Sequence, residues 1–437
     1  MITQFGLEQE TFKTLLEKVW TQGSRSDALE RLRHKAWDVY TELKLPHTHT
    51  EVYRYIKLRQ LFAQPYQLPV ENSSTRLEFS SAILPECQDS CLVFINGYFV
   101  PHLSRTENIP ERVVVLTLQE AIRTYHTFLN NQWTQALKEE TDPFVALNGA
   151  LHQTGAFLYL PPKTTLETPI QILHIIDHEQ QQLLMPRLQV FVGAQSNLQL
   201  ITTQMHQKET NYFINHVTDL TIEEGSHVHV TQLFCDEHPQ SWHLDALRAT
   251  LKRDSTLKTV CVTEGSATVR TDYRVNLAGE NAEALLNGVW MLAEKREAHT
   301  HVLIDHQAPY CRSFQLFKGV LNDFSRSSFE GKIMVRRPAQ KTEAFQLNNN
   351  LLLSDHAQAN SKPNLEIFAD DVKASHGATI GQLDAEQLFY MKTRGFSDEA
   401  SKNLLVYGFC EQVIEQIPIL SMRQNIAERA RSYLAKG

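Results

Sequence analysis

The spacing of apolar residues changes twice along the chain. In the first forty-five residues apolar side chains recur at steps of three and four, which is the helical period. From about Phe157 to Leu383 the period is two, as in strands, and after Leu383 the helical spacing returns. We therefore expect three parts: an N-terminal helical and mixed domain over residues 1–150, a β core over 151–383, and a C-terminal helical domain over 384–437.

The central part consists of short strand-like runs such as QILHII, LQVFVG, HVTDLTI and HVHVTQLF. Polar corners separate them, among them Glu224-Gly225-Ser226 and Arg253-Asp254-Ser255. This pattern is typical of an all-β sandwich, a barrel or a solenoid. About 220 residues are long for one sandwich, whereas stacked coils absorb that length. The corner spacing is irregular, so the pattern favours a β-helix only modestly.

Local signals before the β core predict a hairpin and a helix. The run from Leu92 to Val100 carries Asn96-Gly97, a turn pair typical of tight hairpins. Thr117 and Glu120 have the spacing of a capping box, in which each side chain bonds the other's backbone N–H. We expect the helix that they begin to run to about Glu140.

The C-terminal part predicts a small helical module. Asp384 and Ser397 are suitable N-caps for two helices, and Gly395 suits the end of the first. Pro418 separates the second helix from a last amphipathic segment over 419–434. Such a module is either a cap packed on the β core or a docking surface for a partner.

Composition describes a folded, soluble protein, with 42% hydrophobic and 21% charged residues. The net charge of −8 gives no reason to expect nucleic acid or an anionic membrane as a partner. No apolar run approaches the roughly 20 residues that span a bilayer. The first residues lack a basic start and an apolar signal core, so we expect a cytoplasmic protein.

Cysteine and histidine spacings offer little for a permanent metal site. The six cysteines are scattered, and we interpret them as buried or incidental thiols. Three His-x-His pairs occur, at 47 and 49, 227 and 229, and 299 and 301. Residues i and i+2 of a strand project on one side, so His227 and His229 can share a metal, but spacing identifies no further ligand.

Motifs of self-contained enzymes are absent. The chain has no G-x-x-x-x-G-K-[ST] phosphate loop, no G-x-G-x-x-G after a strand and no G-x-S-x-G. By elimination it reads as a scaffold or interaction protein rather than an enzyme. His376, in KASHGAT, is a separate candidate: small neighbours leave its imidazole accessible, and a neutral imidazole is a good ligand for iron or zinc. A structural or simply exposed histidine is the alternative.

A long C-terminal stretch resembles a known family. The runs SRSSFEGKI, AQKTEAFQLNNNLLLS and SKPNLEIFADDVKASHGATIGQLDAEQLFYMKTRGF are similar to the SufB/SufD proteins of the SUF iron–sulfur cluster assembly system, and LVFINGYFVPHLS adds to the likeness. The DDVKASHGAT segment and the length fit the SufD branch better. The resemblance implies a right-handed parallel β-helix flanked by helical parts. It also implies a non-enzymatic scaffold subunit.

The resemblance further implies two protein partners. A SufB-like protein would pair with strands between residues 340 and 380, and we expect contacts at Leu351, Leu353, Leu365 and Ile367. A SufC-like ATPase would dock on the C-terminal helices, with contacts at Leu388, Phe389, Arg394, Leu404, Leu405 and Phe409. Removal of residues 385–437 is then expected to abolish ATPase binding without unfolding the β body. Exposed strand edges also allow a homodimer when the chain is isolated.

His376 matches the family's interface histidine, which the resemblance implies is a cluster-assembly residue and a transient metal ligand. No cofactor is expected to stay bound; an iron–sulfur cluster would form transiently at the SufB interface. One departure is Ala374, where many SufD proteins have cysteine. The chain would then rely on His376 and on thiolates of its partner.

Two alternatives remain. A SufB-type principal scaffold would need a cysteine at the interface, and none lies between Cys311 and Cys410. A β-solenoid carbohydrate-active enzyme would need a row of carboxylates, and the only dense acidic group near this stretch is Glu366, Asp370 and Asp371.

Overall fold

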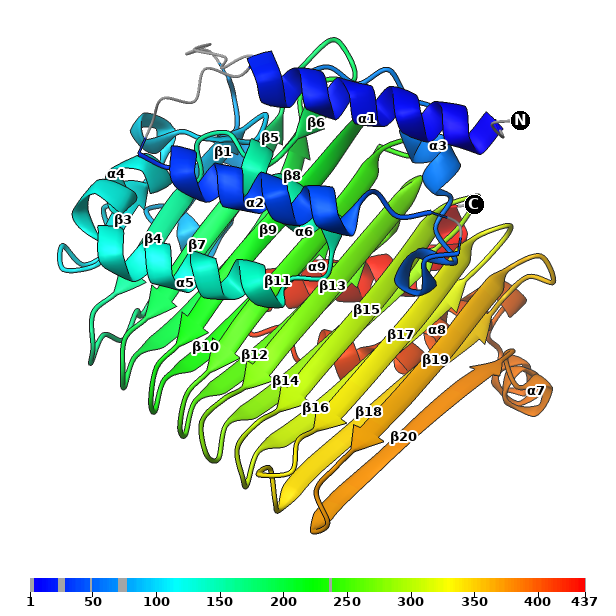
Figure 1. The fold of residues 1–437 in the computed structure, drawn as a ribbon. Coiled ribbons are helices and arrows are strands. Elements are labelled where there is room, and N and C mark those ends of the chain that lie inside the picture. Colours follow the sequence, from blue (N-terminus) through cyan, green and yellow to red (C-terminus); the bar gives the residue numbers. More distant parts are fainter. Residues whose placement is uncertain (1–3, 23–27, 48, 70–76, 236–237, 437) are drawn as a thin grey trace.

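Two stacked β-sheets form the body of the molecule (Figure 1). In the computed structural model, residues 4–22, 28–47, 49–69, 77–235 and 238–436 are described. The chain winds as a parallel β-solenoid of about 8 turns, with helical parts at both ends of the sequence. The expected β-helix is therefore confirmed, and the sandwich and barrel are excluded.

Each turn of the solenoid adds one strand to each sheet. The first sheet has the order β2 (Tyr98–Phe99), β1 (Cys91–Ile95), β5 (Ile170–Ile176), β8 (Asn197–His206), β10 (His227–Phe234), β12 (Thr256–Thr263), β14 (Glu283–Leu292), β16 (Arg312–Leu321), β18 (Thr342–Leu352), β20 (Val372–Gly381). The second has the order β19 (Gln358–Ile367), β17 (Arg326–Val335), β15 (Glu297–His306), β13 (Thr268–Leu277), β11 (Trp242–Leu251), β9 (Tyr212–Ile222), β7 (Arg187–Val192), β4 (Ala156–Leu160), β3 (Val114–Thr117), with β6 (Gln182–Leu184) against β9. Among the strands of the described residues, the pairs β1–β2 and β3–β4 are antiparallel and the others are parallel.

The polar corners reverse the chain between the sheets. Residues with positive φ occupy the predicted corners, among them Gln195 (57°), Gly225 (66°) and Asp254 (54°). Register partners are 26 residues apart at Trp242–Thr268 (268 − 242) and 32 apart at Arg326–Gln358 (358 − 326). Turns of unequal length explain why the corner spacing is irregular in the sequence.

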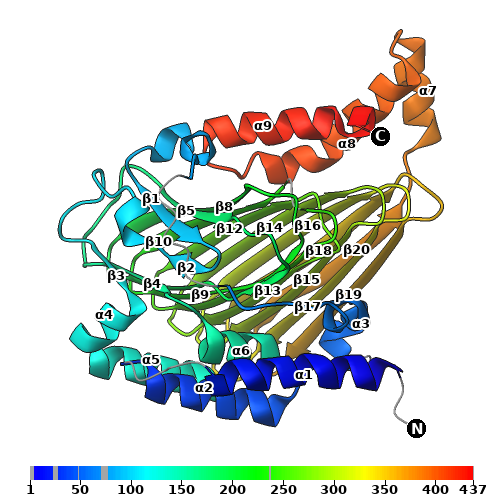
Figure 2. The ribbon, with the colours of Figure 1, turned by 90° about the horizontal axis from the view of Figure 1, so that it is seen from above.

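Helices of the N-terminal part cover the outer face of the second sheet (Figure 2). They are α1 (Gln4–Gln22), α2 (Glu30–Leu43), α3 (Leu58–Phe62), α4 (Leu118–Thr124), α5 (His126–Glu139) and α6 (Pro143–Leu151), with a short 3-10 turn at η1 (Glu51–Tyr53). Three further 3-10 turns, η2 (Ser80–Ala82), η3 (Pro85–Cys87) and η4 (Pro101–Leu103), pack instead with the first sheet. Phe12, Ala36 and Phe144 pack there with Phe213 and Trp242 of the sheet. Among the described residues, no helix is long and apolar enough to cross a membrane.

The predicted local signals are present in the N-terminal part, but the expected helix is split. Asn96 (φ 48°) and Gly97 (φ 84°) form the turn of the β1–β2 hairpin. Thr117 and Glu120 form the capping box of α4, but α4 ends at Thr124, and after Tyr125 a second helix, α5, begins at His126. Strands β1 to β3 come from the segment before residue 151, so the sheets begin inside the part expected to be a separate domain. That domain boundary stays a prediction.

The C-terminal part consists of α7 (Ala385–Thr393), α8 (Asp398–Ile414) and α9 (Leu420–Arg431), followed by η5 (Tyr433–Lys436). As predicted, Asp384 and Ser397 are the N-caps of α7 and α8. α8 and α9 bury Val406, Cys410 and Ile426 against the outer face of the first sheet, beside Val260 and Val289. Removal of residues 385–437 would therefore expose part of the core, contrary to the expectation of a separable module. α7 buries no residue and extends beyond the solenoid (Figure 2).

Candidate functional site

The solenoid is open at its C-terminal end. β19 and β20 are the last strands of their sheets, 10 residues each, and each is paired on one side only (Figure 1). Backbone N–H and C=O groups along the free side of such a strand can pair with another chain. We call this the open end, defined by β19 and β20.

His376 lies on the inward face of β20. Val372 and Ala374 of the same strand pack inside the solenoid with Ala344 and Ile333. Since alternate residues of a strand share a face, His376 also faces inward. Gly377 faces outward, because a Cβ added there would lie 3.1 Å from Cδ1 of the exposed Leu347. No further strand of the described residues stacks on β20, and the inward-facing His376 is therefore exposed.

The open end has an apolar rim and a charged outer surface. Ile367, Phe368 and Ile380 are 38%, 57% and 49% exposed. On the outer surface Lys332 contacts Glu366 at 2.6 Å and Lys373 contacts Glu343 at 2.9 Å. The inward and end-facing surfaces thus offer apolar contact area, while ion pairs between neighbouring strands occupy the outside.

The predicted SufB contacts lie in different surroundings. Leu351 is 8% exposed and packs beneath the C-terminal helices. Leu353 is partly buried against the same core, and Leu365 is partly buried inside the last turn. Only Ile367 is exposed at the open end. Sequence periodicity cannot separate these cases, because it does not show which strand faces lie under helices. Their roles stay predictions.

The predicted ATPase contacts divide in a similar way. Phe389 is 70% exposed and Leu404 is 39% exposed, and Arg394 lies over the Tyr390 ring at 4.9 Å. Leu388, Leu405 and Phe409 are half-buried. The sequence interpretation missed two exposed aromatic residues beside them, Tyr390 (55%) and Phe396 (44%). Together these side chains form an aromatic surface on and beside α7.

The cysteines are poor candidates for cluster ligands. Five of the six are buried, and Cys235 is intermediate. Burial raises the pKa of the Cys261 and Cys410 thiols to about 12 and that of Cys311 to about 11. A thiol ligates metal as the thiolate, so these groups would be protonated and enclosed at neutral pH.

Of the three His-x-His pairs, the one at 299 and 301 has other partners. His299 Nδ1 lies 2.7 Å from Ser328 Oγ, and His301 Nδ1 lies 2.9 Å from Asp272 Oδ2. His227 is exposed at the start of β10, and His229 is half-buried. Within the described ranges, no three His, Cys, Asp or Glu side chains come together in a way that could hold a metal ion.

The acidic group near the open end is engaged by lysines. Glu366 contacts Lys332, and Asp371 contacts Lys341. Carboxylates held by lysines on neighbouring strands are stabilised as surface ion pairs. This arrangement does not favour the carbohydrate-active alternative, which needs a free pair of carboxyl groups on either side of a sugar bond.

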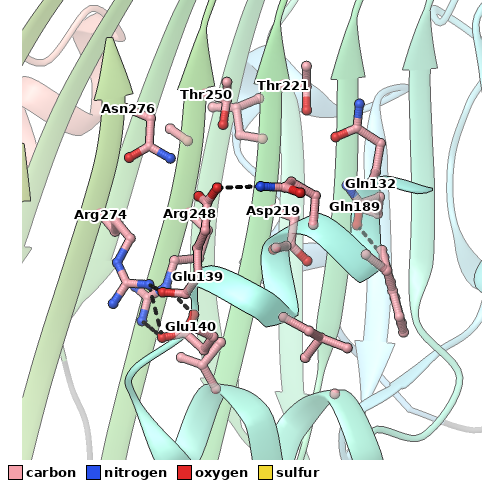
Figure 3. Close-up of a pocket in the computed structure, with 18 of the residues that line it drawn as sticks. Gln132, Glu139, Glu140, Gln189, Asp219, Thr221, Arg248, Thr250, Arg274 and Asn276 are labelled. Atoms are coloured by element: carbon pink, nitrogen blue, oxygen red, sulfur yellow. Dashed lines mark hydrogen bonds and ion pairs between the residues drawn. The ribbon is translucent and has the colours of Figure 1, made fainter. Parts of the chain in front are cut away.

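A pocket between α5, α6 and the second sheet lies away from the open end (Figure 3). Its volume is about 100 Å³, and its walls carry a ladder of ion pairs. Arg248 contacts Glu140 at 2.8 Å and Asp272 at 2.5 Å, and Arg187 contacts Asp219 at 2.5 Å. The Arg248–Glu140 pair connects the end of α5 to the sheet, and the other two pairs connect neighbouring strands, so we assign these buried, paired charges a structural role.

Comparison with known proteins supports the family resemblance. Residues 174–409 match the family described as SUF system FeS cluster assembly, SufBD core domain, and residues 10–172 match the SufBD protein N-terminal region. An iron–sulfur cluster assembly SufBD family protein of Synechocystis is 28% identical over 428 residues, covering 95% of this chain and 93% of that one.

Two relatives carry the name SufD. The iron–sulfur cluster assembly protein SufD of Escherichia coli is 27% identical over 353 residues, 79% of each chain. The SufD protein of Bacillus subtilis is 25% identical over 364 residues, 80% of each chain. With both family regions matched in sequence order on a β-solenoid, the chain belongs to the SufB/SufD family, which takes part in iron–sulfur cluster assembly.

Proposed function

We propose that this chain is a scaffold subunit, without catalytic activity of its own, of a complex that assembles iron–sulfur clusters. Its partners would be a SufB-like protein at the open end and a SufC-like ATPase at the C-terminal helices. The observation that carries the proposal is the open end itself, where two long strands each have one free edge and one of them carries an accessible inward-facing histidine.

Strand pairing supports the first partner. Both sheets stop at strands of 10 residues that have free edges. A second solenoid placed end to end would continue both sheets, satisfy these backbone groups and cover Ile367 and Ile380. A SufB-like chain, as a member of the same family, is the partner that we propose for this position.

The chemistry of the open end supports a contribution to the cluster. The imidazole of His376 is accessible, and imidazole is a good ligand for iron. Burial keeps the pKa of this chain's own thiols Cys261, Cys311 and Cys410 high. The partner would then supply the thiolates of a mixed site in which the cluster is cargo.

The aromatic surface at α7 supports the second partner. Phe389, Tyr390 and Phe396 are exposed together with Arg394. Aromatic residues and arginine are enriched in the parts of protein interfaces that carry most binding energy. The chain has no phosphate-binding loop, so a partner would have to bind the nucleotide.

His376→Ala in the co-expressed complex tests this function. We expect the rate of cluster assembly, monitored by anaerobic absorption spectroscopy, to fall about tenfold. The three proteins should still co-purify, because the substitution removes only a ligand. The control is His356→Ala, which removes another exposed histidine near the same end, stacked on Phe324. Assembly at the wild-type rate in the His376→Ala complex would refute the role of His376.

A further inference from the structure

We propose that Gln346 positions the imidazole of His376, by accepting a hydrogen bond from one ring nitrogen and leaving the other free toward the cluster. Gln346 is thus a positioning residue. The inference rests on the proposed function, because it gives His376 a fixed orientation at the open end.

Gln346 is the direct neighbour of His376. The two residues are register partners on the parallel strands β18 and β20. Both face inward, since Gln346 is 2% exposed and alternates with the buried Ala344 and Asn348. Neighbouring strands lie about 4.8 Å apart, so stacked side chains on one face are within reach of each other.

The amide of Gln346 is held from the opposite sheet. Its Nε2 donates to the carbonyl oxygen of Gly331 on β17, at 3.3 Å. A Cβ added at Gly331 would lie 2.2 Å from Nε2, so glycine leaves the space that lets this amide cross the interior. Since the NH₂ group is engaged there, the Oε1 atom has a defined place and can only accept.

That Oε1 atom lacks a partner. It is buried, and none of the described residues donates a hydrogen bond to it. Buried acceptors without a donor are rare and costly, so a donor is expected when the open end is covered. A ring N–H of the adjacent His376 is such a donor, because a neutral imidazole carries one N–H and one free nitrogen.

This hydrogen bond would select one neutral tautomer of His376. In a metal-binding imidazole, the N–H group of the second ring nitrogen usually donates a hydrogen bond to an acceptor, and this bond fixes the ring orientation. With Gln346 Oε1 as this acceptor, the remaining nitrogen has its lone pair available toward the partner. Loss of the acceptor would leave His376 present but without a preferred orientation.

A double-mutant cycle in the co-expressed complex tests this role. Gln346→Leu keeps much of the volume and removes the acceptor, and we expect it to lower cluster assembly about tenfold. In a His376→Ala background the same change should lower assembly no further, because Gln346 acts through His376.

Gln315→Leu is the matched control. Gln315 is the register partner of Gln346 one turn deeper, is 3% exposed, and has an amide oxygen that, like that of Gln346, accepts no hydrogen bond from the described residues. It is not adjacent to His376, so any effect of Gln315→Leu should be the same with and without His376. Melting temperatures of all variants show whether the solenoid itself is affected.

A second readout is independent of assembly. With ¹⁵N-labelled histidine, the nitrogen shifts of His376 in the complex should show one neutral tautomer at about pH 8.5, well above the usual histidine pKa of about 6.5. Gln346→Leu should give a mixture of tautomers. Equal losses from Gln346→Leu with and without His376, or an unchanged tautomer, would overturn the inference. If His376→Ala alone has no effect, the proposed function fails instead.

Discussion

At the residue scale, the chain separates two kinds of histidine. His376 is exposed at the open end, whereas His174, His216 and His243 are buried inside the solenoid with Asp245. His216 Nδ1 lies 2.7 Å from Asp245 Oδ2. Burial acts to raise the pKa of that carboxyl, but its interactions with His216 and His243 hold the pKa well below its usual value. The sequence could not distinguish these roles, because strand periodicity does not show which residues meet across the interior. Only the setting of His376 among small residues was visible.

Buried histidine also predicts sensitivity to acid. Burial lowers the pKa of His306 to about 4, whereas an unfolded histidine has a pKa of about 6.5. Between these values the unfolded chain binds a proton that the folded chain does not. The stability from neutral His306 is therefore present above about pH 6.5 and is lost as the pH falls toward 4. One pKa unit is worth about 1.4 kcal/mol, so the loss between about pH 6.5 and 4 is at most roughly 3.5 kcal/mol.

His306→Gln should flatten this pH dependence. Urea unfolding at several pH values between about 7 and 4 measures it. The wild-type chain should lose stability steadily on acidification, and the variant should lose about 1–3 kcal/mol less. Replacement of the exposed His356 by Gln serves as the control. Equal slopes for His306→Gln and the wild-type chain would show that this group does not titrate as proposed.

At the scale of elements, local chemistry was predictable and long-range pairing was not. The Asn96-Gly97 turn, the Thr117–Glu120 box and the Asp384 cap are formed because each depends on residues close in sequence. The place of β1 in the first sheet was not predictable, because its neighbour β5 begins only at Ile170. The same reason applies to α8, whose contact with the first sheet makes it part of the core and leaves α7 as the exposed element.

This difference between α7 and α8 determines how the docking surface should be tested. Deletion of the C-terminal part would disturb the core, whereas Phe389→Ala removes a side chain that is 70% exposed. We expect it to weaken association with the SufC-like partner about tenfold without a change in melting temperature, since exposed aromatic anchors often carry interface energy. Isothermal titration calorimetry measures the affinity.

The matched control for that surface is Leu420→Ala. Leu420 is 60% exposed at the start of α9, away from α7 in sequence. It should leave the affinity unchanged. If both substitutions have the same effect, or if Phe389→Ala has none, the aromatic surface is not the docking site.

At the scale of the whole molecule, the two outer sheet faces of the solenoid are covered by helices of the described chain and the open end is not. N-terminal helices pack on the second sheet, α8 and α9 pack on the first, and the open end has no cover from the described chain (Figure 2). The length of the strand-rich region favoured a solenoid only modestly over a sandwich or a barrel, and the family resemblance implied both the β-helix and its function. The position of the uncovered face required the structure, because it depends on which strands come last in both sheets.

Hydrogen–deuterium exchange, with and without the SufB-like partner, tests most directly whether the open end is the pairing face. Free edge strands exchange readily because their backbone N–H groups lack partners. We predict that partner binding protects amides of Gln358–Ile367 and Val372–Gly381, while the amides of α1 and α2 exchange as before. A stable complex that leaves β19 and β20 unprotected and protects another face would contradict the account.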